Sequence, residues 1–515
     1  MKNLRSSRVV ITVLMSTSFF CGCVFDPSGV PSGEIPQDDG AVQKDVSVLI
    51  DGDHPDDGGV TDASLSDGQI LDVISDDAEI LDAEPDAEIV DAFVQEDAAP
   101  PDAGPVCEEA DCPLGCTAPD GRCNRLNPLN FDVEGFYDDI TGDLNIDPDK
   151  TVFVNTQNGS IYAEGKDYRS DGNIGGVSEG IYFDRRTQSD GSTLAVFGVM
   201  NFKLPSSSEI VVEGDASVAF YVVEDGLIGG IIDARAVARE SGPGGGGGGN
   251  TNGDAGEACG DNSNGKGGGE HSTEALESGG GGGANLGSGG RGGNVNYSFY
   301  TVPGGAGGAA RTNTSLVPLA GGCGGGAGGG PDPGGGDGGF GGGGGGGVQI
   351  SCNGTLTIQS GGGVDVGGAG GQGGNYGAGG GAGGSGGSVL LEAAEINNNG
   401  LIAANGGGGG AGGESIYYSV SESGEDADFS TVPALGGTGY YGSGYTCAGT
   451  ACYGGNGGSG GAGSNNDGVR GEDNVPNSGG GGGGVGIIVL RYENSINSGS
   501  CSPANIAQEQ GLSLW

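Results

Sequence analysis

The distribution of glycine is the feature that most limits what this chain can fold into. Of its 515 residues, 124 are Gly, about 24%, whereas the usual share is about 7%. Many of them stand in uninterrupted runs, such as 244–249, 341–347 and 479–484. Only 21 residues are Pro, and glycine does not recur strictly at every third position. The composition therefore excludes a collagen triple helix.

The glycine runs have no side chains that could fill a core, so any order in them must come from the backbone. Isolated polyglycine loses more conformational entropy on folding than any other sequence and stays flexible. Bare backbones laid side by side, however, can approach closely and hydrogen-bond to one another. The runs have similar lengths and flank β segments, so we expect ordered packing, with flexible loops as the alternative. Such packed threefold helices resemble the glycine-rich regions of some receptors and phage adhesins.

Short β-branched and aromatic runs predict strands in two successive regions. Residues 131–240 are expected to form a β-rich domain, because runs such as 152–154 and 218–223 are separated by turn residues. Residues 241–515 are expected to form a glycine-rich, β-solenoid-like domain, in which short apolar clusters recur between Gly and Asn turns. Its β segments include 348–350, 356–358, 389–391 and 487–490. The stretch 387–406 resembles the repeats of filamentous-haemagglutinin-type β-helix surface proteins. The resemblance implies a mainly β, β-helix-like body with interleaved polyglycine.

The N-terminus carries an export signal. Lys2, Arg5 and Arg8 precede an apolar stretch, 9–20, that is too short to span a membrane. The motif Phe20-Cys21-Gly22-Cys23 resembles the lipobox of bacterial lipoproteins, although Phe20 stands where that family prefers Leu. The resemblance implies removal of 1–22, a diacylated Cys23, attachment to a membrane through lipid, and a place at the outer membrane or cell surface. An ordinary signal peptide is the alternative.

Residues 23–106 are expected to form an acidic, disordered tether. Between 26 and 106, 23 Asp or Glu residues stand against Lys44 alone, and the apolar pairs are too sparse to bury a core. The whole chain has a formal net charge of −49. A chain this acidic repels phosphate groups, which excludes nucleic acid as a partner.

Ten cysteines remain beside Cys23 once the signal is removed, an even number that permits full pairing. An oxidising compartment favours disulfides over metal binding. The four cysteines between 107 and 123 predict a small disulfide-stapled module over 107–130, with a zinc site at Cys112 and Cys116 as the alternative. The ten disulfide candidates are Cys107, Cys112, Cys116, Cys123, Cys259, Cys323, Cys352, Cys447, Cys452 and Cys501.

No residue stands out as catalytic, and we expect no metal or cofactor. Only two histidines occur. The alternation of Asp143, Asn145, Asp147 and Asp149 is similar to a calcium loop, but Pro148 and Val154 replace its turn glycine and final glutamate.

Two function classes remain. The first is a lipid-anchored surface protein with a structural or adhesive role and no catalytic activity, which contacts polysaccharide or another cell surface. The alternative is a polysaccharide-binding or polysaccharide-degrading β-helix enzyme, which needs paired carboxylates, or a carboxylate–calcium–arginine cluster, on adjacent coils. Arginine is scarce after residue 241, and no Asp or Glu recurs at the expected coil period. We therefore favour the first class.

Overall fold

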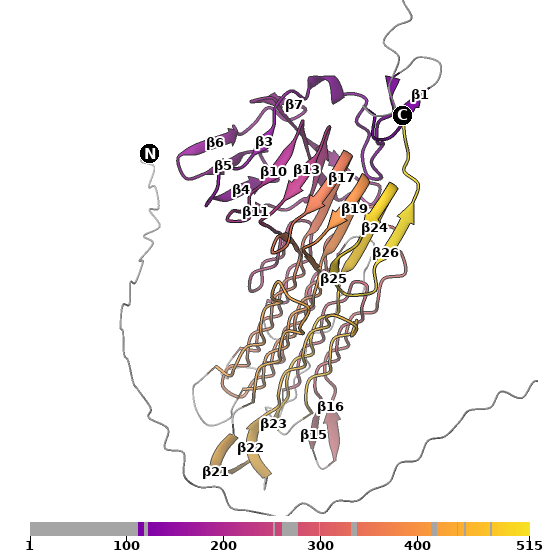
Figure 1. The fold of residues 1–515 in the computed structure, drawn as a ribbon. Coiled ribbons are helices and arrows are strands. Elements are labelled where there is room, and N and C mark those ends of the chain that lie inside the picture. Colours follow the sequence, from indigo (N-terminus) through magenta and orange to yellow (C-terminus); the bar gives the residue numbers. More distant parts are fainter. Residues whose placement is uncertain are drawn as a thin grey trace, which may run out of the picture. The chain divides into compact units, whose positions relative to one another are not determined.

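The computed structural model (Figure 1) describes residues 112–117, 122–250, 253–259, 277–297, 299–330, 337–413, 420–439, 441–447, 450–473 and 476–515. These residues belong to one compact unit, Gln95–Trp515. They are mainly β, and the one helical element among them is the 3-10 turn η2 (Tyr137–Asp139). The predicted signal peptide and tether lie outside the described residues.

The larger of the two main sheets has eleven strands. The strands β12, β17, β19 and β24 run parallel, each hydrogen-bonded to the next. In spatial order the sheet contains β26 (Ala507–Gln510), β24 (Ile487–Asn497), β19 (Ser388–Asn398), β17 (Gly347–Ile358), β12 (Ser217–Val222), β9 (Thr193–Val199), β8 (Ile181–Thr187) and β7 (Gly176–Ser178), with β10 (Phe202–Leu204), β13 (Gly226–Ile228) and β3 (Leu144–Asn145) paired at its side.

The second sheet has eight strands and also grows by parallel addition after its first hairpins. The chain passes from β17 to β18, from β19 to β20 and from β24 to β25, so each pass adds one strand to both sheets. In spatial order it contains β25 (Ser500–Ser502), β20 (Leu401–Ala403), β18 (Gly363–Asp365), β14 (Ile231–Asp233), β11 (Glu209–Glu213), β4 (Thr151–Asn155), β5 (Ile161–Ala163) and β6 (Lys166–Arg169).

One hydrophobic core is built from columns of apolar residues in both sheets. Because the strands are parallel and in register, each apolar cluster of the sequence stacks on the one from the previous pass. The column in the second sheet is Val152, Ile210, Ile232, Val364 and Ile402, and the column in the larger sheet is Phe197, Phe220, Ile350, Leu391 and Leu490. Each of these side chains is fully buried, which stabilises the fold by roughly 1.5–3 kcal/mol per residue. Strands from 131–240 and from 241–515 pair within the same sheets, so the two predicted domains share this core.

Between the strands, the chain leaves the sheets in long excursions of extended glycine segments that run side by side (Figure 1). We call these segments the glycine array. It comprises 244–249, 279–283, 287–293, 304–308, 321–329, 338–346, 367–374, 378–387, 406–413, 455–461 and 478–486.

Hydrogen bonds in the array recur every third residue toward a given neighbour. In segment 338–346, the N–H groups of Gly339, Gly342 and Gly345 donate to carbonyls of 379–385 at 2.8–3.0 Å. Those of Gly341 and Gly344 donate to 246–249, each at 2.9 Å. A backbone that presents a new face at each residue and repeats after three has the geometry of polyproline II, a helix without internal hydrogen bonds. Neighbouring segments therefore satisfy groups that water would otherwise bind.

Glycine is required at many positions of the array because the backbones there lie too close for a side chain. A Cβ atom on Gly344 would lie 2.1 Å from the carbonyl oxygen of Gly322, and one on Gly480 would lie 2.0 Å from that of Gly381. Both obstacles are backbone atoms, which cannot move aside without loss of the hydrogen bonds that hold the array.

Replacement of Gly344 by Val is expected to lower the free energy of unfolding by a few kcal/mol, on the scale of overpacking a tight core. The matched control is Gly135→Val, because Gly135 is exposed and a Cβ atom there meets nothing within 4 Å. Calorimetric melts of both variants and the wild type provide the measurement. A Gly344→Val protein that melts at the wild-type temperature would contradict the packing described above.

Candidate functional site

A group of short strands lies at the end of the array that is farthest from the sheets (Figure 1). We call these five strands the tip. They are β15 (Val295–Tyr297), β16 (Tyr300–Val302), β21 (Tyr441–Cys447), β22 (Thr450–Gly454) and β23 (Pro476–Asn477). β15 and β16 form one antiparallel hairpin, β21 and β22 form another, and β23 adds to β22 in parallel.

Aromatic residues are concentrated at the tip. Its strands carry Tyr297, Tyr300, Tyr441, Tyr445 and Tyr453. Phe299, in the turn between β15 and β16, is 94% exposed. Tyr and Phe are enriched at protein interfaces, where they provide large contact areas. The sequence contained this signal, but the tyrosines are scattered over 157 positions and only the fold brings them to one end.

The β15–β16 hairpin is attached to the array by polar contacts. The backbone N–H of Asn294 donates to Oδ1 of Asp473 at 2.7 Å, and Asp473 also forms an ion pair with Arg470. The hydrogen bond joins residues that are 179 positions apart in the sequence. The strands of the tip are thus held to neighbouring segments of the array.

The first described residues lie at the sheets, at the end of the molecule opposite the tip. The short hairpin of β1 (Cys116–Thr117) and β2 (Arg122–Cys123) lies there (Figure 1), and Leu126 forms a bridge with Leu514. The guanidinium of Arg125 lies 3.6 Å from the centre of the Tyr137 ring and 4.9 Å from that of Trp515. The chain therefore enters the folded body at one end and presents the tip at the other.

The structure contains two disulfides among the described cysteines, Cys112–Cys123 and Cys259–Cys323. The first staples the hairpin of β1 and β2, and the second joins Cys259, in the described segment 253–259, to segment 321–329 of the array. Cys116 is also disulfide-bonded. Cys23, the predicted lipid attachment residue, and Cys107 lie outside the described residues, as do the side chains of Cys447 and Cys452.

Cys352 and Cys501 carry free thiols, so the full pairing that the even count permits does not extend to them. Cys352 is in β17 of the larger sheet, whereas Cys501 is in β25 of the second sheet, two passes further on. Two strand spacings amount to about 9–10 Å, beyond the reach of about 7 Å between Cα atoms that a disulfide allows.

In the larger sheet, a carboxylate and a guanidinium stand in register on adjacent strands. Glu392 in β19 stands in register with Arg491 in β24, and Ser351 in β17 stands in register with Glu392. Glu392 is fully buried and pairs with Arg491, while Ser351 and Gln349 donate to its Oε2 at 2.8 and 2.9 Å. The segment that contains Leu129 covers this cluster. Since the carboxylate is enclosed and its partners are present, its role is to hold adjacent strands in register.

A second in-register pair, Asp233 in β14 and Asp365 in β18, shares Arg235. Arg235 bonds Asp233 at 2.9 Å and lies 3.4 Å from Asp365. The side chain of Asp365 is 2% exposed, and burial raises its pKa to about 7, although Arg235 acts in the opposite direction. The two carboxylates are therefore in different environments, as in acid–base pairs.

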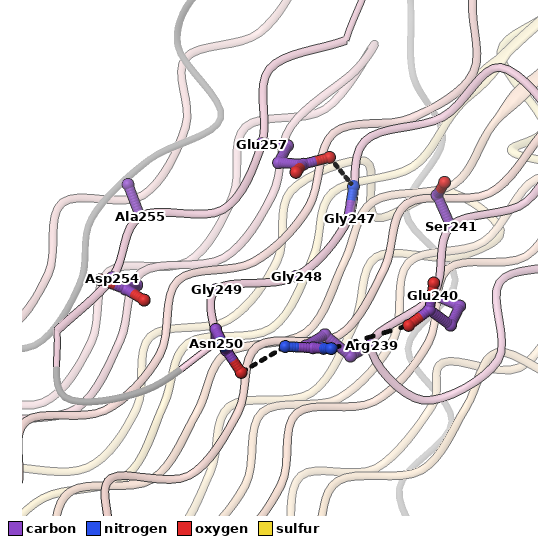
Figure 2. Close-up of a pocket in the computed structure, with 10 residues that line it drawn as sticks. All are labelled: Arg239, Glu240, Ser241, Gly247, Gly248, Gly249, Asn250, Asp254, Ala255 and Glu257. Carbon is purple, nitrogen blue, oxygen red and sulfur yellow. Dashed lines mark hydrogen bonds and ion pairs between the residues drawn. The ribbon is translucent and has the colours of Figure 1, made fainter. Parts of the chain in front are cut away.

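Figure 2 shows a polar hollow of about 460 Å³ on the side of the array. Arg239 reaches toward Asn250 and Glu240, and the N–H of Gly247 donates to Glu257 at 2.9 Å. These groups bond to one another, so the hollow is explained by the packing of the array segments.

Within the described ranges, no group of three or more His, Cys, Asp or Glu side chains is arranged to hold a metal ion. The same residues include no helix long and apolar enough to cross a bilayer.

Comparison of the chain with protein-family models, curated proteins and solved structures finds no match.

Replacement of Asp365 by Asn is expected to stabilise the protein more at pH 8 than at pH 5. The pKa of Asp365 in the folded state is above its unfolded value of about 3.9, so its contribution is fully present below pH 4 and is lost as pH rises through about 7. The amide has no such pH dependence. We expect the difference between the two pH values to be on the order of 2–3 kcal/mol, since about two pH units at about 1.4 kcal/mol each separate pH 5 from the folded pKa.

Urea denaturation of wild type and Asp365→Asn at both pH values is the measurement. The control is Asp171→Asn, at an exposed aspartate. We expect it to change the free energy of unfolding by the same amount at both pH values. Equal effects of Asp365→Asn at pH 5 and pH 8 would show that the carboxyl is not protonated in the folded state near neutral pH.

Proposed function

We propose that the chain is an exported, lipid-anchored cell-surface protein with a structural or adhesive role and no catalytic activity. The observation that carries the proposal is the hydrogen-bonded glycine array, with the sheets at one end and the tip at the other. Segments that bond to neighbours on several sides resist bending more than a flexible loop does. The array therefore serves as a spacer that holds the tip away from the point where the chain enters the body.

The contact surface in this proposal is the tip. An anchor upstream of Cys112 would attach at the sheet end, since the first described residues lie there. The aromatic tip would then be the outermost part of the folded body. Tyrosine and phenylalanine also stack on sugar rings through their apolar faces, which suits a polysaccharide or another cell surface as the partner.

Within this proposal, the two-sheet β fold is a β-solenoid. Its support is the regular alternation of strands between two parallel sheets, one of each per pass. The glycine array interrupts every pass after β14, so each coil contains a pair of strands and an excursion. This arrangement agrees with the resemblance of 387–406 to filamentous-haemagglutinin-type repeats.

The anchor is tested by the replacement of Cys23 by Ser. We expect the protein to move from the membrane fraction to the soluble fraction, because it loses the acyl chains. Globomycin, which blocks lipoprotein signal peptidase, should leave a larger precursor of the wild type. Cys21→Ser is the matched control and should stay in the membrane. Unchanged fractionation of Cys23→Ser would refute the lipid anchor.

The alternative is a polysaccharide-degrading enzyme, and one observation favours it. Asp365, with its pKa raised to about 7, could donate a proton while Asp233 stays paired with Arg235. The segment 427–429 lies over Asp365, since a Cβ atom on Gly367 would contact Ala427 and one on Gly363 would contact Phe429. Catalysis would require this segment to open.

Binding and hydrolysis assays on a panel of acidic and neutral polysaccharides and on whole cells distinguish the two functions. We expect binding without hydrolysis, and Phe299→Ser should weaken binding by about tenfold, the effect of one central aromatic contact. Ile174→Ser removes an apolar residue that is 57% exposed on the sheet end and should leave binding unchanged. Release of sugar products that disappears in Asp365→Asn would favour the enzyme.

A further inference from the structure

Two buried polar residues, Glu277 and Asn477, face each other at the base of the tip. They form an isolated parallel β-bridge, and on its other side Asn477 pairs with Gly454 of β22. Both residues are fully buried. The next residue after each, Ser278 and Ser478, continues into the array, where their carbonyls accept hydrogen bonds from Gly329 and Gly380. The pair thus lies where the tip joins the array.

Three oxygen atoms of this pair are buried without a hydrogen-bond donor from the described residues. They are Oε1 and Oε2 of Glu277 and Oδ1 of Asn477. The amide of Asn477 is oriented by its nitrogen, which donates to the carbonyl of Gly413 at 2.6 Å. Its oxygen is therefore turned away from Gly413 and is left as an acceptor.

Burial of these oxygens costs free energy unless a positively charged group or ion lies next to them. An ionised carboxylate that is buried without a partner loses several kcal/mol of solvation. Among the described ion pairs, none includes Glu277. Burial also raises the pKa of Glu277 to about 7, so near neutral pH the group takes up a proton or needs a cation.

We propose that Glu277 and Asn477 bind a hard cation, which ties the base of the tip to the glycine array. Carboxylate, amide and main-chain carbonyl oxygens are the ligands that Ca²⁺ takes, and the pair contains no nitrogen or sulfur ligand that would select a transition metal. The net charge of −49 raises the local concentration of cations around the protein. Divalent and monovalent hard cations both bind to oxygen ligands, and the experiment below distinguishes between them.

Thermal melts of the mature protein, treated with EDTA and dialysed, provide the test at pH 7.5. We expect Ca²⁺ to raise the melting temperature of the wild type by several degrees, at a concentration that does not change Glu277→Gln. Mg²⁺, Na⁺ and K⁺ form separate arms, and a rise with Na⁺ or K⁺ alone identifies a monovalent site. Cations held weakly by the acidic tether do not affect this readout, because the melt reports the folded body. Glu134→Gln, at an exposed glutamate, is the control and should respond like the wild type.

The competing explanation is a protonated Glu277 that donates to Oδ1 of Asn477. In that case no cation raises the melting temperature. Stability instead falls as pH rises from about 4.3 to about 7 in the wild type, and the fall is smaller in Glu277→Gln, which keeps only the part that Asp365 contributes. That result would overturn the proposal. If Glu277→Gln does not fold, the wild-type melts with and without cation still decide between the two outcomes.

Discussion

The close approach of glycine backbones is the constraint on which the rest of the structure depends. Segment 478–486 illustrates it, since its N–H groups donate in turn to 407–410, 280–283 and Val469. No side chain fills the space between these segments. A hydrogen bond contributes only about 0.5–1.5 kcal/mol net, whereas ordering one residue costs about 1–2 kcal/mol. Isolated pieces of the array would therefore not fold, and the array needs a base that fixes where each segment starts and ends.

The two parallel sheets provide that base. Because β17, β19 and β24 are in register, the glycine segments that lead into them, 338–346, 378–387 and 478–486, begin at the same level and side by side. Burial of the apolar columns stabilises the strands, and the strands align the segments. The Cys259–Cys323 disulfide adds a covalent link between segment 321–329 of the array and the neighbouring segment 253–259. The stability of the array is thus derived from a hydrophobic core that lies outside it.

The enclosed ion pair and the exposed aromatic residue of the tip lie in different parts of the molecule. Glu392 and Arg491 are buried and hold neighbouring strands together, whereas the exposed Phe299 is in the tip, at the far end of the array. In the function that we propose, such a spacer would keep the contact surface independent of the core, so that the sequence of the tip could vary without disturbing the strands. The buried pair of Glu277 and Asn477 is the exception, because it lies where the two parts meet.

The sequence by itself determined that the chain is mainly β and where several strands lie. The predicted segments 348–350, 356–358, 389–391 and 487–490 all fall within β17, β19 and β24, because β-branched runs bounded by Gly and Asn are a local signal. Only the tertiary structure decided which residues stack. Ile350 and Leu391 are 41 residues apart, but Leu391 and Leu490 are 99 apart, although each pair is in register. The glycine excursions differ in length and hide the period, so the alignment of Glu392 with Arg491, or of Asp233 with Asp365, could not be predicted. Register is set by the packing of whole passes, which no local pattern records.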